Sequence, residues 1–194
     1  MSVNTIEQNQ QRQALHDYDE IWLFGYGSLI YKVDFPFIQQ SPGFISGWQR
    51  RFWQGSHDHR GTLEQPGRVV TLIPAAGMHC FGMAYQVTAD VFEHLDHREK
   101  NGYLRHEVVI TLTDKKQSRE VLGLIYIADE SNEAYLGPAS EREIAEHIAN
   151  SCGPSGENSE YLLSLAKSLR ELGAVDDHVF AIEEYLLNRN PPIL

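Results

Sequence analysis

The sequence is poor in cysteine, in basic residues and in long apolar runs, and each shortage excludes a class of protein. Only two cysteines occur in 194 residues, too few for a disulfide framework and suited to a reducing compartment. The 16 basic residues are outnumbered by 27 acidic ones, giving a net charge of −11, whereas binding to a nucleic-acid backbone requires positive charge. No apolar run approaches the roughly 20 residues of a membrane-spanning helix, and the N-terminus lacks a secretion signal. We therefore expect a cytoplasmic protein that binds neither nucleic acid nor membrane.

What the sequence does contain fits one globular domain. Hydrophobic residues make up 42% of the chain and charged residues 22%, close to the average of globular proteins. A chain of 194 residues buries roughly 70% of its unfolded surface, so its core needs no disulfides. Residues 1–20 are polar and rich in glutamine, and we expect a frayed or weakly helical lead-in. Residues 21–194 are expected to form a single domain.

Short apolar or alternating segments, bounded by glycine, proline or charged turns, predict six strands. They are Ile21–Phe24, Phe44–Phe52, Arg68–Ile73, Cys80–Val87, Glu107–Thr113 and Val121–Ala128. Pro74 is expected to end the third strand, and the charged residues 114–117 are expected to form the turn between the last two. A strand-rich body followed by helices predicts an α+β fold in which the strands close into a small barrel.

Helical spacing appears once between the strands and then throughout the last third of the chain. The predicted helices are Ala89–Lys100, Ser140–Ala149, Glu160–Leu172 and Val179–Leu187. Thr88 is expected to cap the first helix, and Ser140-Glu141-Arg142-Glu143 is a capping box that opens the second. Gly173 is expected to end the third.

The first candidate site is the Gly25-Tyr26-Gly27-Ser28-Leu29 segment that follows the first strand. Its two glycines allow positive φ, so that successive backbone N–H groups could converge on an anion such as a carboxylate. The Ser28 hydroxyl would add a further donor. An ordinary tight turn is the alternative interpretation, because so short a motif is not specific.

Residues 47–72 form a second candidate because their charge runs against that of the chain. This stretch contains no lysine and four arginines, Arg50, Arg51, Arg60 and Arg68. A guanidinium group recognises the planar carboxylate better than an ammonium group does. The alternative is that these arginines pair with the surplus acidic residues elsewhere in the chain.

The third candidate is Glu99, at the end of the first predicted helix. The apolar face of that helix, counted from Phe92 and Leu95, reaches position 99. A carboxylate there would point inward near the helix C-terminus, where the macrodipole and desolvation both raise its pKa. Such a group is suited to act as a general base at neutral pH. The alternative is a terminal glutamate that pairs with Arg98 or Arg105.

The residue patterns of most cofactor sites and nucleophiles are missing. The histidines at positions 57, 59, 94 and 97 have no third and fourth ligand at zinc spacing, so hydrogen-bonded scaffolding is the favoured interpretation. Neither Cys80 nor Cys152 belongs to a C-x-x-C pair. No G-x-S-x-G elbow, P-loop or full dinucleotide fingerprint occurs. We therefore expect no metal and no cofactor.

Five stretches of the chain, in the same order, resemble the ChaC-type γ-glutamylcyclotransferases. They are WLFGYGSLI followed by Val33–Pro36, RRFWQGSHDHRGTLEQPGRVVTL (Arg50–Leu72), LDHREKNGY (Leu95–Tyr103), YLGPAS (Tyr135–Ser140) and GPSGENSEYL (Gly153–Leu162). The resemblance covers about Trp22–Leu187 with little insertion, and residues 1–20 lie outside it. His57 stands where threonine is expected in the family.

The resemblance implies a small closed mixed β-barrel with flanking helices, several of them C-terminal. It also implies an enzyme that cleaves glutathione into 5-oxoproline and Cys-Gly without a metal or cofactor. Glu99 matches the family's catalytic glutamate. The loop that holds the α-carboxylate of the γ-glutamyl group is matched by Tyr26, Gly27, Ser28 and Leu29.

Two further sets of residues are expected around the substrate. Tyr103, Tyr126 and Tyr135 fall, more loosely, where the wider cyclotransferase group places pocket tyrosines. Arg51 or Arg68 is expected to receive the glycine carboxylate of glutathione, an assignment that rests on their charge and not on the family match.

The expected chemistry is an attack of the substrate's α-amine on its own γ-carbonyl. As an ammonium ion the amine has no lone pair, so Glu99 would remove a proton and later protonate the departing cysteinyl nitrogen. Holding both groups of one molecule in place contributes an effective molarity of about 10⁵ M or more. A cyclotransferase for other γ-glutamyl compounds and a non-catalytic ligand-binding regulator on the same fold remain the alternatives. No oligomeric state is predicted.

Overall fold

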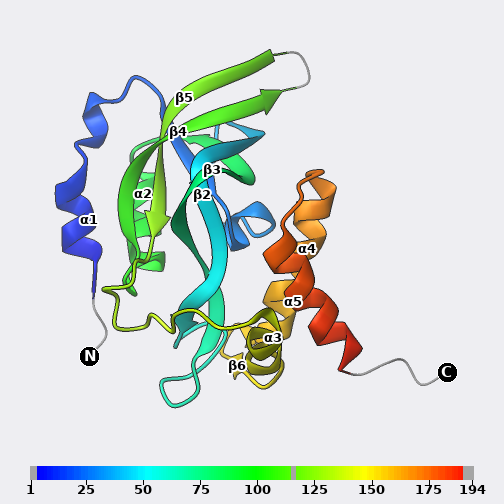
Figure 1. Cartoon of the computed structure of the whole chain (residues 1–194). Coiled ribbons are helices and arrows are strands. Elements are labelled where there is room, and N and C mark those ends of the chain that lie inside the picture. Colours follow the sequence, from blue (N-terminus) through cyan, green and yellow to red (C-terminus); the bar gives the residue numbers. More distant parts are fainter. Residues whose placement is uncertain (1–3, 115–116, 190–194) are drawn as a thin grey trace. The chain divides into compact units, whose positions relative to one another are not determined.

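The computed structural model describes residues 4–114 and 117–189 (Figure 1). The chain divides into two compact units, of which the first takes in Met1–Gln49 and Leu72–Glu133 and the second Arg50–Thr71 and Ala134–Leu194. None of the helices in the described part of the chain combines the length and the apolar character that crossing a membrane requires.

Five strands close into a barrel in the order β1-β3-β2-β4-β5. Their bounds are Ile21–Gly25 for β1, Gln39–Ser56 for β2, Gly67–Val87 for β3, Leu104–Asp114 for β4 and Gln117–Ile127 for β5. Strand β1 runs antiparallel to β3 and parallel to β5, whereas β4 runs antiparallel to both β2 and β5. The predicted α+β fold with a closed mixed barrel is therefore confirmed.

The core of the first unit lies between the barrel and α2 (Val91–Arg98). Its buried members are Ile21, Leu23, Leu29, Phe35, Tyr85, Val87, Val91, Phe92, Leu95, Leu124 and Tyr126. The strand residues alternate, as side chains on one face of a strand do, and the helical residues follow the spacing of one helix face. The apolar face that the sequence predicts for this helix is therefore the face that fixes α2 to the barrel.

The residues that precede β1 form α1 (Ile6–Arg12) and the 3-10 turn η1 (Leu15–Asp17). Two polar side chains of this region are buried. Thr5, the residue before α1, is 1% exposed, and Asn9, within α1, is fully buried. A glutamine-rich composition gives no sign of this burial, because it depends on hydrogen-bond partners that lie far away in the sequence.

Three expected boundaries differ in the structure. Pro74 does not end a strand, because β3 continues through it as one strand of 21 residues. Pro74 is exposed there, and a strand tolerates proline where no neighbour needs the missing N–H. Thr88 does not cap α2, since the N-cap residue is Asp90 and it makes no side-chain cap hydrogen bond. Of the expected turn, residues 115–116 lie outside the described part of the chain.

The C-terminal helices belong to the second unit. They are α3 (Glu141–Ala149), α4 (Asn158–Glu171) and α5 (Asp177–Asn188), with the hairpin β6 (Cys152–Gly153) and β7 (Gly156–Glu157) before α4. The predicted capping box is confirmed, because Ser140 accepts from the Glu143 N–H while Glu143 accepts from the Ser140 N–H. Gly173 follows α4 with φ +69°, the left-handed conformation typical of a helix end.

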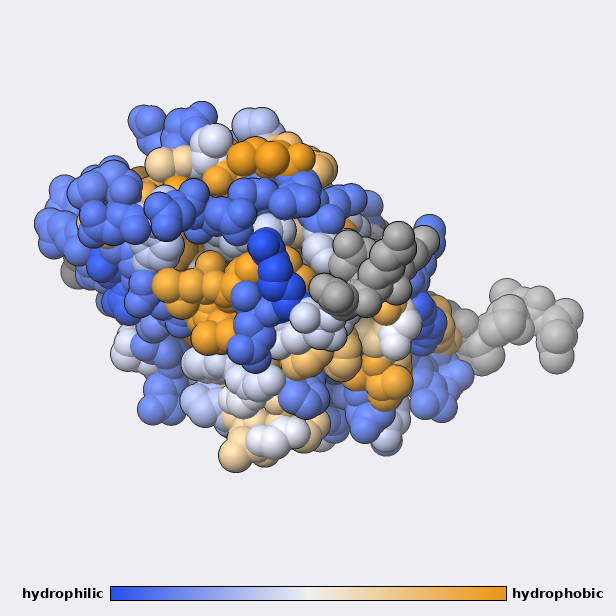
Figure 2. Space-filling view, turned by 90° about the horizontal axis from the view of Figure 1, so that it is seen from above, coloured by the Kyte–Doolittle hydropathy of each residue, from blue (hydrophilic) through white to orange (hydrophobic). Residues whose placement is uncertain are grey.

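The surface drawn in Figure 2 is hydrophilic for the most part, with hydrophobic patches between the polar residues. The exposed large apolar side chains include Val109 and Leu122, which are register partners on β4 and β5. Directly opposed residues of an antiparallel pair share one face of the sheet. An exposed pair of this size is common on protein surfaces and does not by itself indicate a partner.

Candidate active site

The segment 26–29 leads from the end of β1 into the 3-10 turn η2 (Ser28–Ile30). The positive φ expected of its glycines is wrong, since neither Gly25 nor Gly27 has it and Gly27 has φ −125°. Gly25 is required for a different reason, because a Cβ atom there would lie 2.6 Å from the Cβ of Leu29. The missing side chain lets the turn fold back onto the end of its strand.

Two buried tyrosine hydroxyls tie this turn to the barrel. Tyr85 donates a hydrogen bond of 2.6 Å to the backbone oxygen of Leu29. Tyr26 donates one of 2.7 Å to the backbone oxygen of Tyr126. Burial raises the pKa of Tyr85 to about 12, so its hydroxyl keeps the proton that it donates at neutral pH.

Arg98, at the end of α2, connects the turn to Glu99. Its Nη2 donates to Ser28 Oγ over 2.9 Å, and its Nη1 lies 2.6 Å from Asp34 Oδ1. Its Nε lies 3.3 Å from Glu99 Oε1, and the side chains of Arg98 and Glu99 are only 15% and 19% exposed. Partial burial lowers the effective dielectric constant, so these charges act on one another more strongly than on an open surface.

Glu99 is the C-cap residue of α2, and its N–H bonds to the Leu95 oxygen over 2.8 Å. Burial raises the pKa of Tyr126, the hydrogen bond and charge of Asp96 raise it further, and the negative charge of the Glu99 carboxylate makes a smaller contribution in the same direction. The pairing with Arg98 that the sequence left as an alternative is present. Glu99 therefore stands at the edge of the apolar helix face, beside both a cation and a buried tyrosine.

Asp96 is a buried carboxyl group of the same region that the sequence analysis missed. Its Oδ1 accepts a hydrogen bond of 2.6 Å from the Tyr126 hydroxyl, and its Oδ2 lies 3.5 Å from Arg105 Nη1. Burial raises the pKa of Asp96, while the bond from Tyr126 and the charge of Arg105 oppose that rise. A signal for this residue exists, because position 96 lies four residues beyond Phe92 and therefore on the same helix face.

The first unit thus brings together most of the predicted site. Tyr103 is partly buried against the core, and its N–H bonds to the Glu99 oxygen over 3.2 Å. Tyr126 is 4% exposed and lies in the core itself. The residues connected in this way are Tyr26, Ser28, Leu29, Arg98, Glu99, Tyr103 and Tyr126.

Arg68 belongs to the second unit, where its guanidinium group is held by backbone carbonyls. Nη1 donates to the oxygens of Phe52 and Gly137 over 2.9 and 3.0 Å. The residue is 8% exposed, and burial lowers its pKa. Its buried Nε has no hydrogen-bond partner among the described residues. These contacts stabilise the second unit whatever else Arg68 binds.

The other predicted residues of the second unit are Arg51 and Tyr135. Arg51 is half-buried, and its Nη1 donates to the Arg50 oxygen over 2.8 Å. Tyr135 forms an isolated antiparallel bridge with Gln54. The backbone bridge fixes the position of Tyr135 along β2.

Arg50 and Arg60 pair with acidic residues, as the alternative interpretation requires. Arg50 lies 2.5 Å from Asp176, and its side chain is 1% exposed. Arg60 lies 2.7 Å from Glu160, with a side chain that is 10% exposed. Both pairs join the strand-derived part of the second unit to its helical part, so they are structural contacts.

Histidines and cysteines form no cluster in the part of the chain that the structure describes, where no group of three or more His, Cys, Asp or Glu side chains is placed to hold a metal ion. His59 Nδ1 lies 3.1 Å from Ser155 Oγ, a scaffolding contact. Cys80 is buried, Cys152 is exposed, and both are free thiols.

Comparisons with known proteins identify relatives of this chain. A family model described as ChaC-like protein matches residues 21–189. Glutathione-specific gamma-glutamylcyclotransferase 1 of Danio rerio is 46% identical over 182 residues, which cover 90% of this chain and 92% of that protein. Gamma-glutamylcyclotransferase 2-3 of Arabidopsis thaliana is 46% identical over 169 residues, or 82% and 84% of the two chains. A crystal structure of the yeast γ-glutamylcyclotransferase specific to glutathione matches with a TM-score of 0.82 and 33% identity, covering 90% of this chain and 98% of that one.

Proposed function

The chain belongs to the ChaC-like protein family, and on this basis we propose that it is a glutathione-specific γ-glutamylcyclotransferase. The reaction converts glutathione into 5-oxoproline and Cys-Gly. The observation that carries the proposal is the 46% identity to the Danio rerio enzyme of that name across 90% of this chain. The yeast structure with the same stated specificity supports it, since its fold agrees over 90% of this chain.

Glu99 is the proposed general base and acid. The α-nitrogen of the substrate forms a new bond to its own γ-carbonyl carbon, and the bond from that carbon to the cysteinyl nitrogen breaks. The α-nitrogen loses two protons on its way from ammonium to lactam N–H, one before the attack and one after the new bond has formed. Glu99 accepts each of them and passes it to the departing cysteinyl nitrogen, which gains two protons and leaves as an ammonium group, so that no net proton is consumed. Its place at the edge of the α2 face, with a side chain 19% exposed, supports this role because a base must meet the substrate.

The turn 26–29 and Arg98 are proposed to hold the α-carboxylate of the γ-glutamyl group. The first N–H groups of a helical turn have no partner within the turn, and Ser28 adds a hydroxyl. Arg98 contributes a charge that attracts a carboxylate. Because Arg98 contacts both Ser28 and Glu99, a carboxylate held here would bring the neighbouring α-amine within reach of the base.

The remaining substrate contacts are proposed on the residues that the family resemblance and charge suggest. Tyr103 and Tyr126 in the first unit and Tyr135 in the second are proposed substrate contacts on the family resemblance alone. The Tyr126 hydroxyl already donates its one proton to Asp96 Oδ1 over 2.6 Å, so its proposed contact with the substrate is as a hydrogen-bond acceptor. Arg51 is a better candidate than Arg68 for the glycine carboxylate, because Nη1 of Arg68 already donates to two backbone oxygens.

A cyclotransferase for other γ-glutamyl compounds is the second candidate function. A specific observation favours it, since the Arabidopsis thaliana relative is equally identical at 46% and its name does not restrict the substrate to glutathione. Such an enzyme would keep Glu99 and the turn 26–29, which act on the γ-glutamyl group common to all these compounds. It would not need a residue for the glycine carboxylate.

The setting of this activity is also a proposal. We infer that residues 21–194 work as one domain, which the uninterrupted family match over residues 21–189 supports. We further infer a cytoplasmic location, because free thiols such as Cys80 and Cys152 persist in reducing compartments. The partner is then a small peptide substrate, with no nucleic acid or membrane involved.

A substrate panel tests the proposed function. The pure protein is incubated separately with glutathione, γ-glutamyl-alanine and γ-glutamyl-lysine, and 5-oxoproline is measured. Product from glutathione alone supports the proposal, and comparable rates with all three support the second candidate. No product from any of them would overturn both and leave the non-catalytic ligand-binding regulator.

A further inference from the structure

The residues in front of β1 hold the backbone segment that carries Glu99. This segment, residues 99–103, connects α2 to β4 and is called here the Glu99 loop. Residues 4–13, called here the N-terminal strap, run alongside it, with Asn4 and Asn101 forming an isolated antiparallel bridge. The strap lies outside residues 21–189 that the family model matches.

Thr5 makes the densest set of contacts with the Glu99 loop. Its N–H donates to the Lys100 oxygen over 3.0 Å. Its Oγ1 lies 3.4 Å from the backbone oxygen of Glu99 and 3.1 Å from those of Lys100 and Tyr103. A hydroxyl has one proton to donate, so Thr5 stands where it can serve any of three carbonyls. Threonine is a favoured N-cap residue, yet it makes no side-chain cap bond to α1.

Asn9 holds the far end of the same loop. Its Nδ2 donates to the Tyr103 oxygen over 3.0 Å, and its Oδ1 accepts from the Arg105 N–H over 2.8 Å. Both halves of the amide are therefore used, and the side chain is fully buried. It is the one buried residue of α1, so this helix is attached through polar contacts and not through an apolar face.

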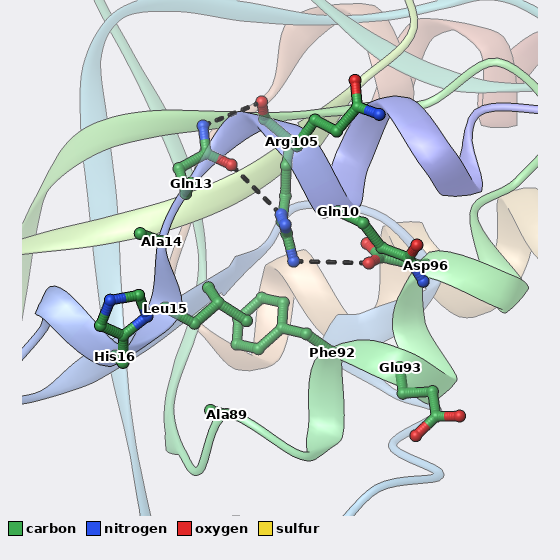
Figure 3. Close-up of a pocket in the computed structure, with 11 residues that line it drawn as sticks. Gln10, Gln13, Ala14, Leu15, His16, Ala89, Phe92, Glu93, Asp96 and Arg105 are labelled. Carbon is green, nitrogen blue, oxygen red and sulfur yellow. Dashed lines mark hydrogen bonds and ion pairs between the residues drawn. The ribbon is translucent and has the colours of Figure 1, made fainter.

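The strap is also connected to α2 indirectly, through Arg105 of β4. Figure 3 shows the Gln13 side chain bonded to both the backbone oxygen and Nε of Arg105, over 3.4 and 3.2 Å. The guanidinium group of Arg105 continues to Asp96 on α2, with 3.5 Å between Nη1 and Oδ2. Asp96 in turn accepts from Tyr126. Glu99 thus lies in a loop that bonds directly to the strap, and it follows a helix that is connected to the strap through Arg105.

We propose that Thr5 and Asn9 are positioning residues that keep Glu99 where proton transfer can occur. The inference rests on the proposed function of Glu99 as the general base. A base must stand within hydrogen-bond reach of the proton that it takes, and a displacement of about 1 Å can lower a rate roughly 100-fold. The strap binds backbone carbonyls at both ends of the Glu99 loop. These bonds restrict the backbone of the loop and thereby limit the positions that the Glu99 carboxylate can take.

Four single variants of the full chain test this in the 5-oxoproline assay. Thr5→Val removes the hydroxyl at constant shape, and Asn9→Ala removes the amide. Both are expected to lower kcat about tenfold while KM stays within about twofold, because the base and not the substrate is displaced. Thr5→Ser keeps the hydroxyl and is expected to retain kcat. Gln8→Ala, an exposed position on the same helix, is the matched control and is expected to leave kcat unchanged.

Thermal unfolding of each variant separates positioning from loss of fold. If Asn9→Ala does not fold, the comparison of Thr5→Val with Thr5→Ser carries the test. The proposal is overturned if kcat of folded Thr5→Val stays within about twofold of the unmodified chain, or if Gln8→Ala loses as much as Thr5→Val. A rise in KM at constant kcat would also overturn it.

Hydrogen exchange gives a second readout that needs no substrate. Amide exchange of residues 99–105 is expected to rise about tenfold or more in Thr5→Val and Asn9→Ala, but not in Gln8→Ala, because the loop loses its bonds to the strap. Unchanged exchange in both strap variants overturns the proposal even if the enzyme is active. A failure of the unmodified chain to release 5-oxoproline from any γ-glutamyl substrate overturns the proposed function instead, so the two failures are distinguishable.

Discussion

Arg98 donates a hydrogen bond of 2.9 Å to the hydroxyl oxygen of Ser28, 70 positions away in the sequence. The same guanidinium group lies 3.3 Å from the Glu99 carboxylate. One side chain therefore connects the turn after β1 with the end of α2, the two parts of the candidate site that the sequence suggested separately. From the sequence alone, Arg98 was only a possible partner for Glu99.

Replacing Arg98 by alanine is expected to weaken substrate binding more than catalysis. The change removes the cation beside the turn and the donor to Ser28, and a hydrogen bond to a charged group contributes about 1.5–3 kcal/mol. We expect KM for glutathione to rise about tenfold or more and kcat to fall by less. The measurement is steady-state release of 5-oxoproline. Arg142→Ala is the matched control, because Arg142 is 74% exposed in an ion pair along α3, and an unchanged KM in Arg98→Ala would contradict the assignment.

Replacing Glu99 by glutamine is expected to abolish turnover while binding is retained. Glutamine keeps the size and the hydrogen-bonding shape of the side chain but cannot accept a proton. General base catalysis raises a reaction rate roughly 100-fold to 10,000-fold, so kcat should fall at least about 100-fold. Binding of glutathione is measured by calorimetry and the fold by circular dichroism. Glu93→Gln, exposed on the same helix, serves as the control, and near-normal turnover of Glu99→Gln would remove Glu99 from the mechanism.

Replacing Arg51 by alanine tests whether this residue binds the glycine end of glutathione. If Arg51 receives the glycine carboxylate, KM for glutathione rises about tenfold, whereas KM for γ-glutamylcysteine, which has no glycine, changes little. The ratio of the two KM values is the measurement, and Arg142→Ala is again the control. Equal effects on both substrates would show that Arg51 does not recognise the glycine end.

The stability of the second unit is expected to fall as the pH drops below neutrality, through His178. Its Nε2 accepts a hydrogen bond of 3.1 Å from the Phe52 N–H, which a proton on that nitrogen would break. Burial lowers the pKa of His178 below its ordinary value of 6.5, although the nearby Glu141 carboxylate opposes this. A lowered folded-state pKa means that the stabilisation is present above pH 6.5 and is lost as the pH falls through the folded-state value.

The melting temperature, measured from about pH 8 to about pH 5, checks this. The unmodified chain should lose more stability over that range than His178→Gln, in which nothing titrates at this position. The control is His16→Gln, because the side chain of His16 is 84% exposed. Parallel melting curves for the unmodified chain and His178→Gln would contradict the prediction.

Local features of the fold could be predicted from the sequence because they depend on neighbouring residues. The apolar run at Ile21–Phe24, the helix face of Leu95 and the capping box of Ser140 each involve residues only a few positions apart. The continuation of β3 through Pro74 could not be predicted, since it depends on whether a neighbouring strand needs the N–H that proline lacks.

The same distinction between local and long-range contacts applies to the candidate site. The position of Glu99 at a helix end follows from helical spacing within one short segment. The burial of Asp96 depends on Tyr126, 30 residues later, and the burial of Thr5 on carbonyls 94 to 98 residues later. Hydrogen bonds over such separations leave no periodic pattern in a single sequence, so a polar residue in the lead-in was indistinguishable from an exposed one.

Gly102, three residues after Glu99, has φ +93°, which residues with a side chain rarely adopt. A Cβ atom there would lie 1.9 Å from Nδ2 of Asn132, the group that donates to the Asn101 oxygen over 3.4 Å. Any replacement would therefore strain the backbone and push the Asn132 amide away. A substitution of Gly102 would therefore deform the loop that carries Glu99 without changing any group that takes part in the reaction. The absence of a side chain at position 102 is thus a requirement of the site in the same way as the presence of Glu99 is.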